Sequence, residues 1–283
     1  MNVREALNMG RKQLYEAGVA SPALDSQLIL SHVLGTDRIK LFVYDEINLT
    51  KKQQERYEIL LAKRCRFVPI AYIIGRKEFY GLNFYIKRGV LIPRPETEFV
   101  VEEALNTAGT ITNPVIADLC CGSGAISVAI AVNNKKAKVY AIEISDVACE
   151  VARRNINAHD VQDRVLLLKG DLWMPLEQSK IKELDIIVSN PPYIPTQELK
   201  SLPNDVKNEP QLALDGGSDG LEFYRRIIPR APEFLKKPGG RIIFEIGWDQ
   251  ASDVKDILEK SGFKQIKVRK DYADFDRVIT GVL

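Results

Sequence analysis

The feature that most constrains the fold is an alternation that fills residues 114–283. Short β-branched apolar runs are each followed by a stretch with helical spacing, except at the end of the chain, where two runs are adjacent. Apolar strands that alternate with helices form parallel sheets covered on both faces. The pattern therefore predicts an α/β fold with a doubly wound, mostly parallel, seven-stranded sheet. The predicted strands are residues 114–119, 137–144, 164–172, 184–190, 240–247, 264–270 and 276–283.

The N-terminal quarter of the chain has a different character. Residues 1–75 read as helices, with predicted helix starts at Ser21, Asp37 and Thr50. Residues 76–92 are aromatic and β-branched with interrupting glycines, which predicts a hairpin. We therefore expect a helical domain over 1–75, a β-hairpin linker over 76–92 and the α/β domain over 93–283.

Composition excludes several classes of protein. Forty Lys and Arg against 38 Asp and Glu give a net charge of +2, without the basic excess of a non-specific nucleic-acid binder. No apolar run is long enough to span a membrane, and the N-terminus has no apolar signal core, so we expect a cytoplasmic protein. Four cysteines and two histidines show no metal-binding spacing, so no metal site is expected.

In a doubly wound sheet, ligands bind beyond the carboxyl ends of the strands. The first predicted strand runs into a glycine-containing loop, where the backbone can approach a ligand closely and a helix N-terminus offers free N–H groups. A tight strand-to-helix turn would look the same, and Ser127 stands where a dinucleotide fingerprint has its third glycine. The candidate cofactor-binding residues of this loop are Asp118, Cys120, Cys121, Gly122, Ser123 and Gly124.

Two further strand ends carry carboxylates. Glu143 ends the second strand, where an acidic residue can accept both hydroxyls of a ribose. Asp171 lies at the end of the third strand, where it can accept from an adenine amino group, with Leu172 as an apolar wall. Alone, Asp171 is no more than a turn residue. Together, the glycine loop and Glu143 predict a ligand of the adenosine type.

The fourth strand ends in Asn190-Pro191-Pro192-Tyr193. Two prolines terminate a strand because each removes a backbone donor. A terminator, however, requires neither the amide nor the phenol. Asn190 offers a carbonyl acceptor and two donors, and a residue before proline is extended, which holds its side chain in a defined direction. Tyr193 offers a flat face, so the motif predicts a site for a planar group that carries an NH₂.

With these residues in place, the chain resembles class I S-adenosylmethionine-dependent methyltransferases, which are Rossmann-like. It resembles most closely the bacterial release-factor glutamine methyltransferase family (PrmC/HemK-like). The leucine-isoleucine-proline-arginine-proline-glutamate-threonine-glutamate run of residues 91–98 and the 190–193 motif are its most specific elements. The segments that carry the resemblance are 71–84, 89–102, 117–127, 188–195, 208–228 and 244–250.

The resemblance implies an activity. S-adenosyl-L-methionine would be the cofactor and S-adenosyl-L-homocysteine its product. The substrate would be class 1 peptide chain release factors, methylated on the side-chain amide nitrogen (N5) of the glutamine in their Gly-Gly-Gln motif. Asn190, Pro191 and Tyr193 would be catalytic, and Pro192 would join them in binding the substrate. Asn190 would also border the cofactor, the helical domain would recognise the substrate, and a monomer is expected.

The chain departs from the family pattern at two places. Cys120 and Cys121 replace a glycine and a small hydroxyl residue, which would tighten the cofactor loop. Asp274 stands where glycine is common in the terminal hairpin.

Several alternatives remain at this stage. Adenine also presents a planar NH₂, so a nucleic-acid adenine N6 methyltransferase is the main one, although it would need a basic surface for a flipped base. A non-catalytic adenosine-binding module and a nicotinamide oxidoreductase are weaker. Arg94, Glu96 and Glu98 fit a helix start with a salt bridge as well as a role in positioning the substrate.

Overall fold

The computed structural model describes residues 1–283, and its contacts divide the chain into two compact units. The helical unit comprises Met1–Arg76 together with Pro203–Asn208, and the α/β unit comprises Lys77–Leu202 and Glu209–Leu283. The six-residue segment 203–208 therefore belongs to the helical unit, although it lies far along the sequence. No helix of the chain is both long and apolar enough to cross a membrane.

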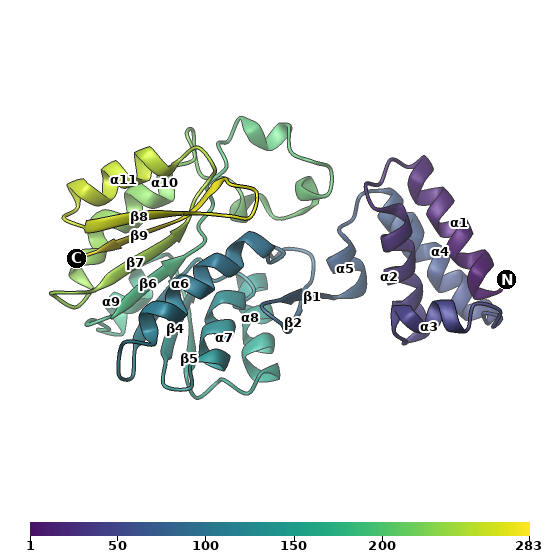
Figure 1. Cartoon of the computed structure of the whole chain (residues 1–283), viewed down its shortest axis with the longest axis horizontal. Helices are drawn as coiled ribbons and strands as arrows, with labels where there is room; N and C mark the ends of the chain where they lie inside the picture. Colours follow the sequence, from purple (N-terminus) through teal and green to yellow (C-terminus); the bar gives the residue numbers. More distant parts are fainter. The chain divides into compact units, whose positions relative to one another are not determined.

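Five α-helices build the helical unit (Figure 1). They are α1 (Val3–Glu16), α2 (Pro22–Leu34), α3 (Arg38–Val43), α4 (Lys51–Cys65) and α5 (Ile70–Ile74). Thr50 caps α4 through a capping box with Gln53, whereas the side chains of Ser21 and Asp37 make no cap hydrogen bond. Apolar side chains of α1, α2 and α4 form the core, in which the buried Tyr57 hydroxyl lies 2.8 Å from the hydroxyl of Ser26.

A buried ion pair ties segment 203–208 into this unit. Arg64 of α4 donates to Asp25 at 2.6 Å and to Asp205 at 2.7 Å. Asn208 adds a hydrogen bond to the carbonyl oxygen of Phe67 at 3.1 Å. A buried guanidinium needs paired acceptors because its desolvation is costly, so the segment completes the helical core.

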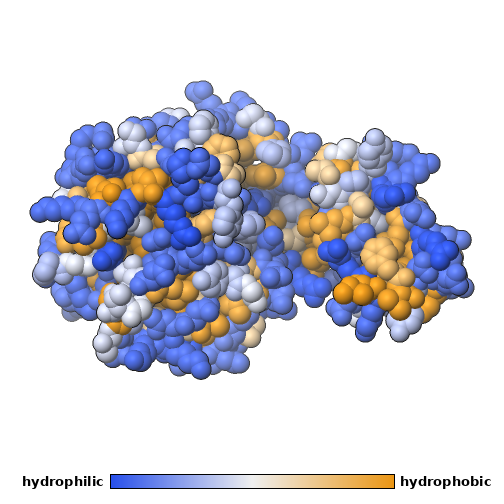
Figure 2. Space-filling view, in the orientation of Figure 1, coloured by the Kyte–Doolittle hydropathy of each residue, from blue (hydrophilic) through white to orange (hydrophobic).

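The helical unit also exposes large apolar side chains around α3. Ile39, Phe42, Val43 and Tyr44 are all more than half exposed, as is Ile47 just beyond. Figure 2 shows apolar colour gathered over this part of the unit. Clusters of exposed apolar residues of this kind are typical of binding surfaces.

The α/β unit begins with a two-stranded hairpin and contains a seven-stranded sheet. Its strands are β1 (Arg76–Phe79) and β2 (Leu82–Tyr85) in the hairpin, then β3 (Val115–Leu119), β4 (Lys138–Glu143), β5 (Val165–Lys169), β6 (Ile186–Ser189), β7 (Arg241–Glu245), β8 (Lys264–Lys270) and β9 (Asp276–Val282). The sheet order is β5-β4-β3-β6-β7-β9-β8; β3 to β7 are parallel and β9 is antiparallel to both neighbours. The predicted fold class, including the terminal hairpin, is confirmed.

Helices cover both faces of the sheet (Figure 1). They are α6 (Glu98–Ala108), preceded by the 3₁₀ turn η1 (Pro95–Thr97), then α7 (Ala125–Asn133), α8 (Asp146–Ala158), α9 (Met174–Gln178), α10 (Glu222–Ile227) and α11 (Ala251–Lys260). Short 3₁₀ turns occupy Glu198–Lys200, Val206–Asn208, Gln211–Ala213 and Ile228–Glu233. One core cluster joins α9, α10 and α11 to alternate strand residues such as Ala117 and Leu119, while α7 contacts α6 and α8 in the other layer.

One predicted helix is shorter than expected. Residues 219–235 read as a single helix, but α10 ends at Ile227 and a 3₁₀ turn follows. Pro229 and Pro232 are the reason, because proline lacks the N–H that an α-helix requires.

The sheet order places a switch point between β3 and β6. Chain connections lead away from this pair in opposite directions, which opens a crevice at the carboxyl ends of the two strands. Leu119 and Ser189, the last residues of β3 and β6, are register partners, and the Ser189 hydroxyl donates to the Leu119 carbonyl at 2.6 Å. The glycine loop and the 190–193 motif therefore start side by side.

Candidate functional site

The glycine loop after β3 is held by the carboxylate of Glu143 at the end of β4. One carboxylate oxygen accepts from the Gly122 N–H at 2.8 Å. The other accepts from the N–H groups of Ile144 and Ser145 at 2.9 and 2.8 Å. Cys120 adopts a φ of 60°, in the left-handed region that favours glycine, so the loop curls tightly between β3 and α7.

Asp118, the last acidic residue of β3, is fully buried beneath this loop. Its Oδ2 accepts from the N–H and hydroxyl of Ser127 at 3.1 and 2.6 Å. Its Oδ1 is the one buried side-chain nitrogen or oxygen atom in the chain with no hydrogen-bond partner. Burial, with a smaller contribution from Glu143, raises the pKa of Asp118 to about 7. Ser127, noted in the sequence only as a missing glycine, is the partner of this carboxylate.

A cleft of about 540 Å³, partly open to solvent, lies at the switch point. Six of the ten predicted cofactor-binding residues line it, namely Cys120, Gly122, Glu143, Asp171, Leu172 and Asn190. The predicted substrate residue Pro192 also lines it. The other four predicted residues, Asp118, Cys121, Ser123 and Gly124, lie in or under the loop without lining the cleft.

Sequence reasoning missed much of the apolar wall of this cleft. The additional lining residues are Leu91, Ile142, Ile144, Gly170, Leu212, Ala213 and Phe223. Leu91 belongs to the diagnostic 91–98 run and Ile142 and Ile144 flank Glu143, so three of them had a signal in the sequence. Leu212, Ala213 and Phe223 lie in segment 208–228, which carries part of the resemblance, but no pattern within that segment marked them as cleft residues.

Asp171 is engaged differently from expectation. Its carboxylate forms an ion pair with Arg226 of α10 and is about two-fifths exposed. An oxygen that accepts from Arg226 retains capacity for a second donor, so the ion pair positions the carboxylate at the cleft wall. Leu172 beside it is buried and adopts a φ of 46°.

The amide of Asn190 is fixed by a residue of η1. Its Nδ2 donates to the hydroxyl oxygen of Thr97 at 3.0 Å. Thr97 in turn donates its hydroxyl proton to Glu245 Oε2 at 2.6 Å. Tyr193 donates its phenolic proton to the other oxygen, Oε1, at 3.2 Å. Glu245, at the end of β7, thus joins Asn190 and Tyr193 through side-chain hydrogen bonds.

The protonation of this cluster follows from burial. Burial raises the pKa of Glu245 to about 7, against the hydrogen bonds from Thr97 and Tyr193 and the nearby charge of Arg277. Burial, reinforced by Glu245, also raises the pKa of the Tyr193 phenol, so Tyr193 is a hydrogen-bond donor at neutral pH. Pro191 and Pro192 are buried, which restrains the backbone between Asn190 and Tyr193.

The charged residues of the 91–98 run separate into different roles. Arg94 forms an ion pair with the buried carboxylate of Glu209, which also accepts from the N–H of Ile92 at 2.9 Å. Glu98 accepts from the N–H of Tyr80 at 2.8 Å. These two contacts hold the run against the loop beginning at 209 and the hairpin.

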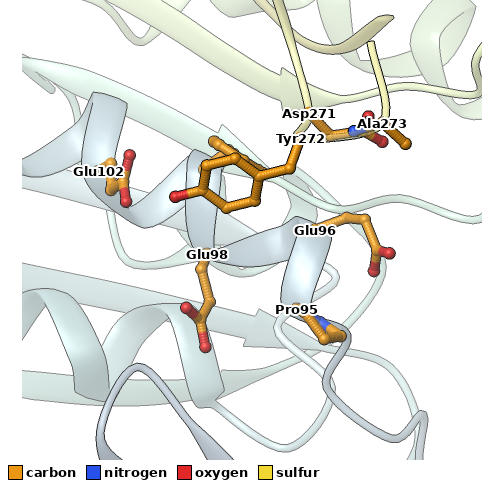
Figure 3. A pocket seen from close by; sticks show the side chains of 8 residues that line it. Pro95, Glu96, Glu98, Glu102, Asp271, Tyr272 and Ala273 are labelled. Carbon is orange, nitrogen blue, oxygen red and sulfur yellow. Dashed lines mark hydrogen bonds between the residues drawn. The ribbon is translucent and has the colours of Figure 1, made fainter. Parts of the chain in front are cut away.

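Glu96 lines a second cleft, of about 550 Å³, between the start of α6 and the turn that joins β8 to β9 (Figure 3). Figure 3 shows the ring of Tyr272 over this cleft, with carboxylates from η1 and α6 around it. The cleft shares no lining residue with the switch-point cleft and has no glycine loop, so it is not the adenosine site. Its lining residues are Pro95, Glu96, Glu98, Phe99, Glu102, Asp271, Tyr272 and Ala273.

Comparison with known proteins matches both units of the chain. Residues 5–75 match the family model described as PrmC N-terminal domain, and residues 97–204 match that of the methyltransferase small domain. Among solved structures, the hMettl16 catalytic domain in complex with the MAT2A 3'UTR hairpin 6 is similar, with a TM-score of 0.59 and 17% identity over 83% of each chain. A methyltransferase from Pyrococcus furiosus has a TM-score of 0.53 and 21% identity, over 82% of this chain and 98% of its own. At these identities the two structures support the fold alone.

Curated relatives are much closer in sequence. The release factor glutamine methyltransferase of Clostridium acetobutylicum is 42% identical over 100% of this chain and 99% of its own length. Its counterparts in Clostridium botulinum and Geobacter sulfurreducens are each 41% identical over 99% of this chain, and over 98% and 96% of their own lengths. Such identity over the full length of both proteins leaves one assignment: the chain belongs to the release factor glutamine methyltransferase family.

Proposed function

We propose that this chain uses S-adenosylmethionine to methylate the side-chain amide nitrogen (N5) of the glutamine in the Gly-Gly-Gln motif of class 1 peptide chain release factors. The observation that carries the proposal is the amide of Asn190, which is held rigidly at the edge of an adenosine-type cleft. Full-length relatives named as release factor glutamine methyltransferases support the same reaction.

The cleft suits the cofactor. Gly122 lines it with a φ of 56°, a conformation that favours glycine, and a Cβ added there would meet no protein atom within 4 Å. Glu143 and the ion-paired Asp171 provide acceptors for ribose hydroxyls and for the adenine amino group, and Ile142 and Leu172 provide apolar walls. The unpartnered oxygen of Asp118 lies under the loop, and this carboxyl would add negative charge there, which favours a cationic ligand, once the pH exceeds its raised pKa of about 7. The cofactor supplies an electrophilic methyl group on a sulfonium.

An amide nitrogen is a poor nucleophile because its lone pair is delocalised. The site therefore acts mainly by position, and proximity supplies much of the rate. The Oδ1 of Asn190 and the carbonyl oxygen of Pro191 accept the two N–H bonds of the glutamine amide. These contacts strengthen as positive charge develops on nitrogen, so they stabilise the transition state more than the bound substrate.

Tyr193 packs against the amide plane and excludes water. Its phenol is anchored to Glu245, which prevents the ring from turning away. No strong base is required, because the amide proton becomes acidic once the new bond begins to form.

We propose that the helical unit recognises the release factor. The exposed apolar residues around α3, including Phe42 and Val43, provide the surface. A Phe42→Ser variant is expected to raise KM for an intact release factor several-fold, while kcat is unchanged. A short Gly-Gly-Gln peptide serves as the control, since its KM should not respond.

The test of the proposed function uses S-adenosylmethionine labelled in its methyl group. The chain is incubated separately with a class 1 release factor, with the same factor carrying Ala in place of the motif glutamine, and with DNA or RNA. Label is expected on the first alone. Label only on nucleic acid would instead identify an adenine N6 methyltransferase.

A further inference from the structure

The hydroxyl of Thr97 has only one proton, and the structure shows where that proton goes. Thr97 Oγ1 lies 2.6 Å from Glu245 Oε2. When Glu245 is ionised, as it is above its pKa of about 7, its carboxylate is an acceptor only, so the hydroxyl is the donor in this contact. The same oxygen lies 3.0 Å from the amide nitrogen of Asn190 and can then act only as an acceptor.

This constraint decides the orientation of the Asn190 amide. With Thr97 as acceptor, the amide must present its NH₂ group to Thr97, and Oδ1 faces the opposite way. No protein group donates to that Oδ1. If Thr97 could donate instead, the amide could turn over and present NH₂ to an incoming amide, where two donors would face each other. The carboxylate of Glu245 removes that alternative.

Glu245 is itself held in place from several sides. Tyr193 donates to its Oε1 at 3.2 Å, and Tyr224 of α10 donates to its backbone carbonyl oxygen at 2.8 Å. The residue is 1% exposed, so water does not compete for the hydroxyl of Thr97. A single buried carboxylate therefore sets the direction of both polar side chains of the 190–193 motif.

We propose that Thr97 and Glu245 are positioning residues, which fix the acceptor face of Asn190 toward the amide to be methylated. This inference rests on the proposed function, since it assigns the orientation of the group that binds the substrate nitrogen. Neither residue touches the reacting atoms, and both act through Asn190.

Substitutions at Thr97 separate the hydroxyl from its packing. Thr97→Val keeps the volume of the buried side chain and removes the oxygen, whereas Thr97→Ser keeps the oxygen. We expect Thr97→Val to lower kcat by about 10- to 100-fold, with KM for the release factor and cofactor affinity within about threefold. Thr97→Ser should restore kcat to within about threefold of the wild-type value. Thr110→Val, at an exposed position beyond α6, is the matched control and should behave as wild type.

A double-mutant cycle distinguishes positioning from general support of the fold. Because Thr97 acts through Asn190, adding Thr97→Val to Asn190→Ala should cost no further activity. Independent multiplication of the two losses would overturn the inference. So would a Thr97→Val enzyme with wild-type kcat, or a Thr97→Ser enzyme as impaired as Thr97→Val.

Glu245 gives an independent readout through pH. The groups that face its carboxylate are Thr97, Tyr193 and Arg277, with Glu96 nearby. Protonated Glu245 can donate to Thr97, so the hydroxyl of Thr97 can then donate to Asn190 and the Asn190 amide can turn over. Wild-type kcat should therefore fall as the pH drops through about 7. Glu245→Gln keeps an acceptor for Thr97 at every pH, so its kcat should stay within about fivefold of the wild-type value and lose this dependence. Glu245→Ala should resemble Thr97→Val, and an acid limb that persists in Glu245→Gln would contradict the role of this carboxylate.

All variants are assayed as the full chain on the acceptor that the wild type labels. If that acceptor is nucleic acid rather than a release factor, the proposed function fails, yet the cycle still measures whether Thr97 orients Asn190 toward a planar NH₂. The two failures are thus distinguishable.

Discussion

The two halves of the switch-point site are built in different ways. On the β3–β4 side, carboxylates hold backbone: Glu143 accepts three main-chain N–H groups, and Asp118 accepts one with a hydroxyl. On the β6–β7 side, side chains hold side chains, from Asn190 through Thr97 to Glu245. The first half shapes a loop, whereas the second aims a single amide. Changes in the first should therefore affect stability and cofactor affinity, and changes in the second should affect turnover.

The largest expected effect concerns Asp118 and pH. Its pKa rises from 3.8 to about 7 on folding, so the native state binds a proton that the unfolded state has released. The free energy of unfolding should therefore fall as pH rises from about 4 to about 7, by up to about 4 kcal/mol. Asp118→Asn should lose this contribution, which denaturant titrations at several pH values would measure. The raised pKa of Glu245 gives the free energy of unfolding a pH dependence of the same sign, so Glu245→Gln is measured beside Asp118→Asn. If neither variant changes the dependence of the unfolding free energy on pH, the raised pKa values of the two carboxyls are refuted.

Asn190→Ala tests the other half. Loss of a contact that strengthens in the transition state should lower kcat by about 100-fold or more, with cofactor affinity nearly unchanged. Single-turnover kinetics and calorimetric titration of the cofactor would measure the two quantities. Full activity in this variant would remove Asn190 from the mechanism, and a parallel loss of cofactor affinity would erase the contrast between the halves.

Glu143→Ala should show the reverse pattern. Three N–H groups lose their charged acceptor, and the loop that borders the cofactor is released. We expect cofactor affinity to fall by about 10- to 100-fold, with a smaller change in kcat at saturating cofactor. Glu143→Gln, which retains one carbonyl acceptor, should have a cofactor affinity between those of the wild type and Glu143→Ala. Equal losses in affinity and turnover would mean that the halves are coupled.

The smallest expected effect is at Cys120. Glycine at position 120 would remove the backbone strain of a side chain at a φ of 60°. It would also make the loop more flexible in the protein without cofactor. Cofactor affinity should weaken by about two- to fivefold in Cys120→Gly, as measured by equilibrium binding. Asp274→Gly, at a φ of 66° in the exposed turn between β8 and β9, is the control that should leave affinity unchanged.

The same contrast explains how far the sequence could predict the structure. Glu143 and the loop that it holds lie within 21 residues of each other, and Ser127 lies nine residues from Asp118, so local pattern and strand order place them. Thr97 and Glu245 lie 148 residues apart, and Thr97 and Asn190 lie 93 apart. Thr97 and Glu245 read as an ordinary helix-start and an ordinary strand-end residue, whereas Asn190 was predicted from its motif. Only the order of strands in the sheet, with the start of α6 beside β6 and β7, brings them together.

Asp171 illustrates a related gap. Its place after β5 was predictable from periodicity, but its ion pair with Arg226 depends on how α10 packs against the sheet. Similarly, Pro229 and Pro232 were visible in the sequence, yet the helical spacing of residues 219–235 concealed the early end of α10. Periodicity reports which face of an element is buried, and it does not report the partner.

Segment 203–208 has a consequence for dissecting the protein. Because this segment returns to the helical unit, the polypeptide passes between the two units three times rather than once. Deleting residues 1–76 would remove Arg64 and Phe67, the hydrogen-bond partners of Asp205 and Asn208. Isolating residues 1–76 would leave the buried guanidinium of Arg64 without the carboxylate of Asp205. The helical unit therefore cannot be exchanged as residues 1–76 alone. A chimaera that takes this unit from a relative must also take the relative's equivalent of residues 203–208.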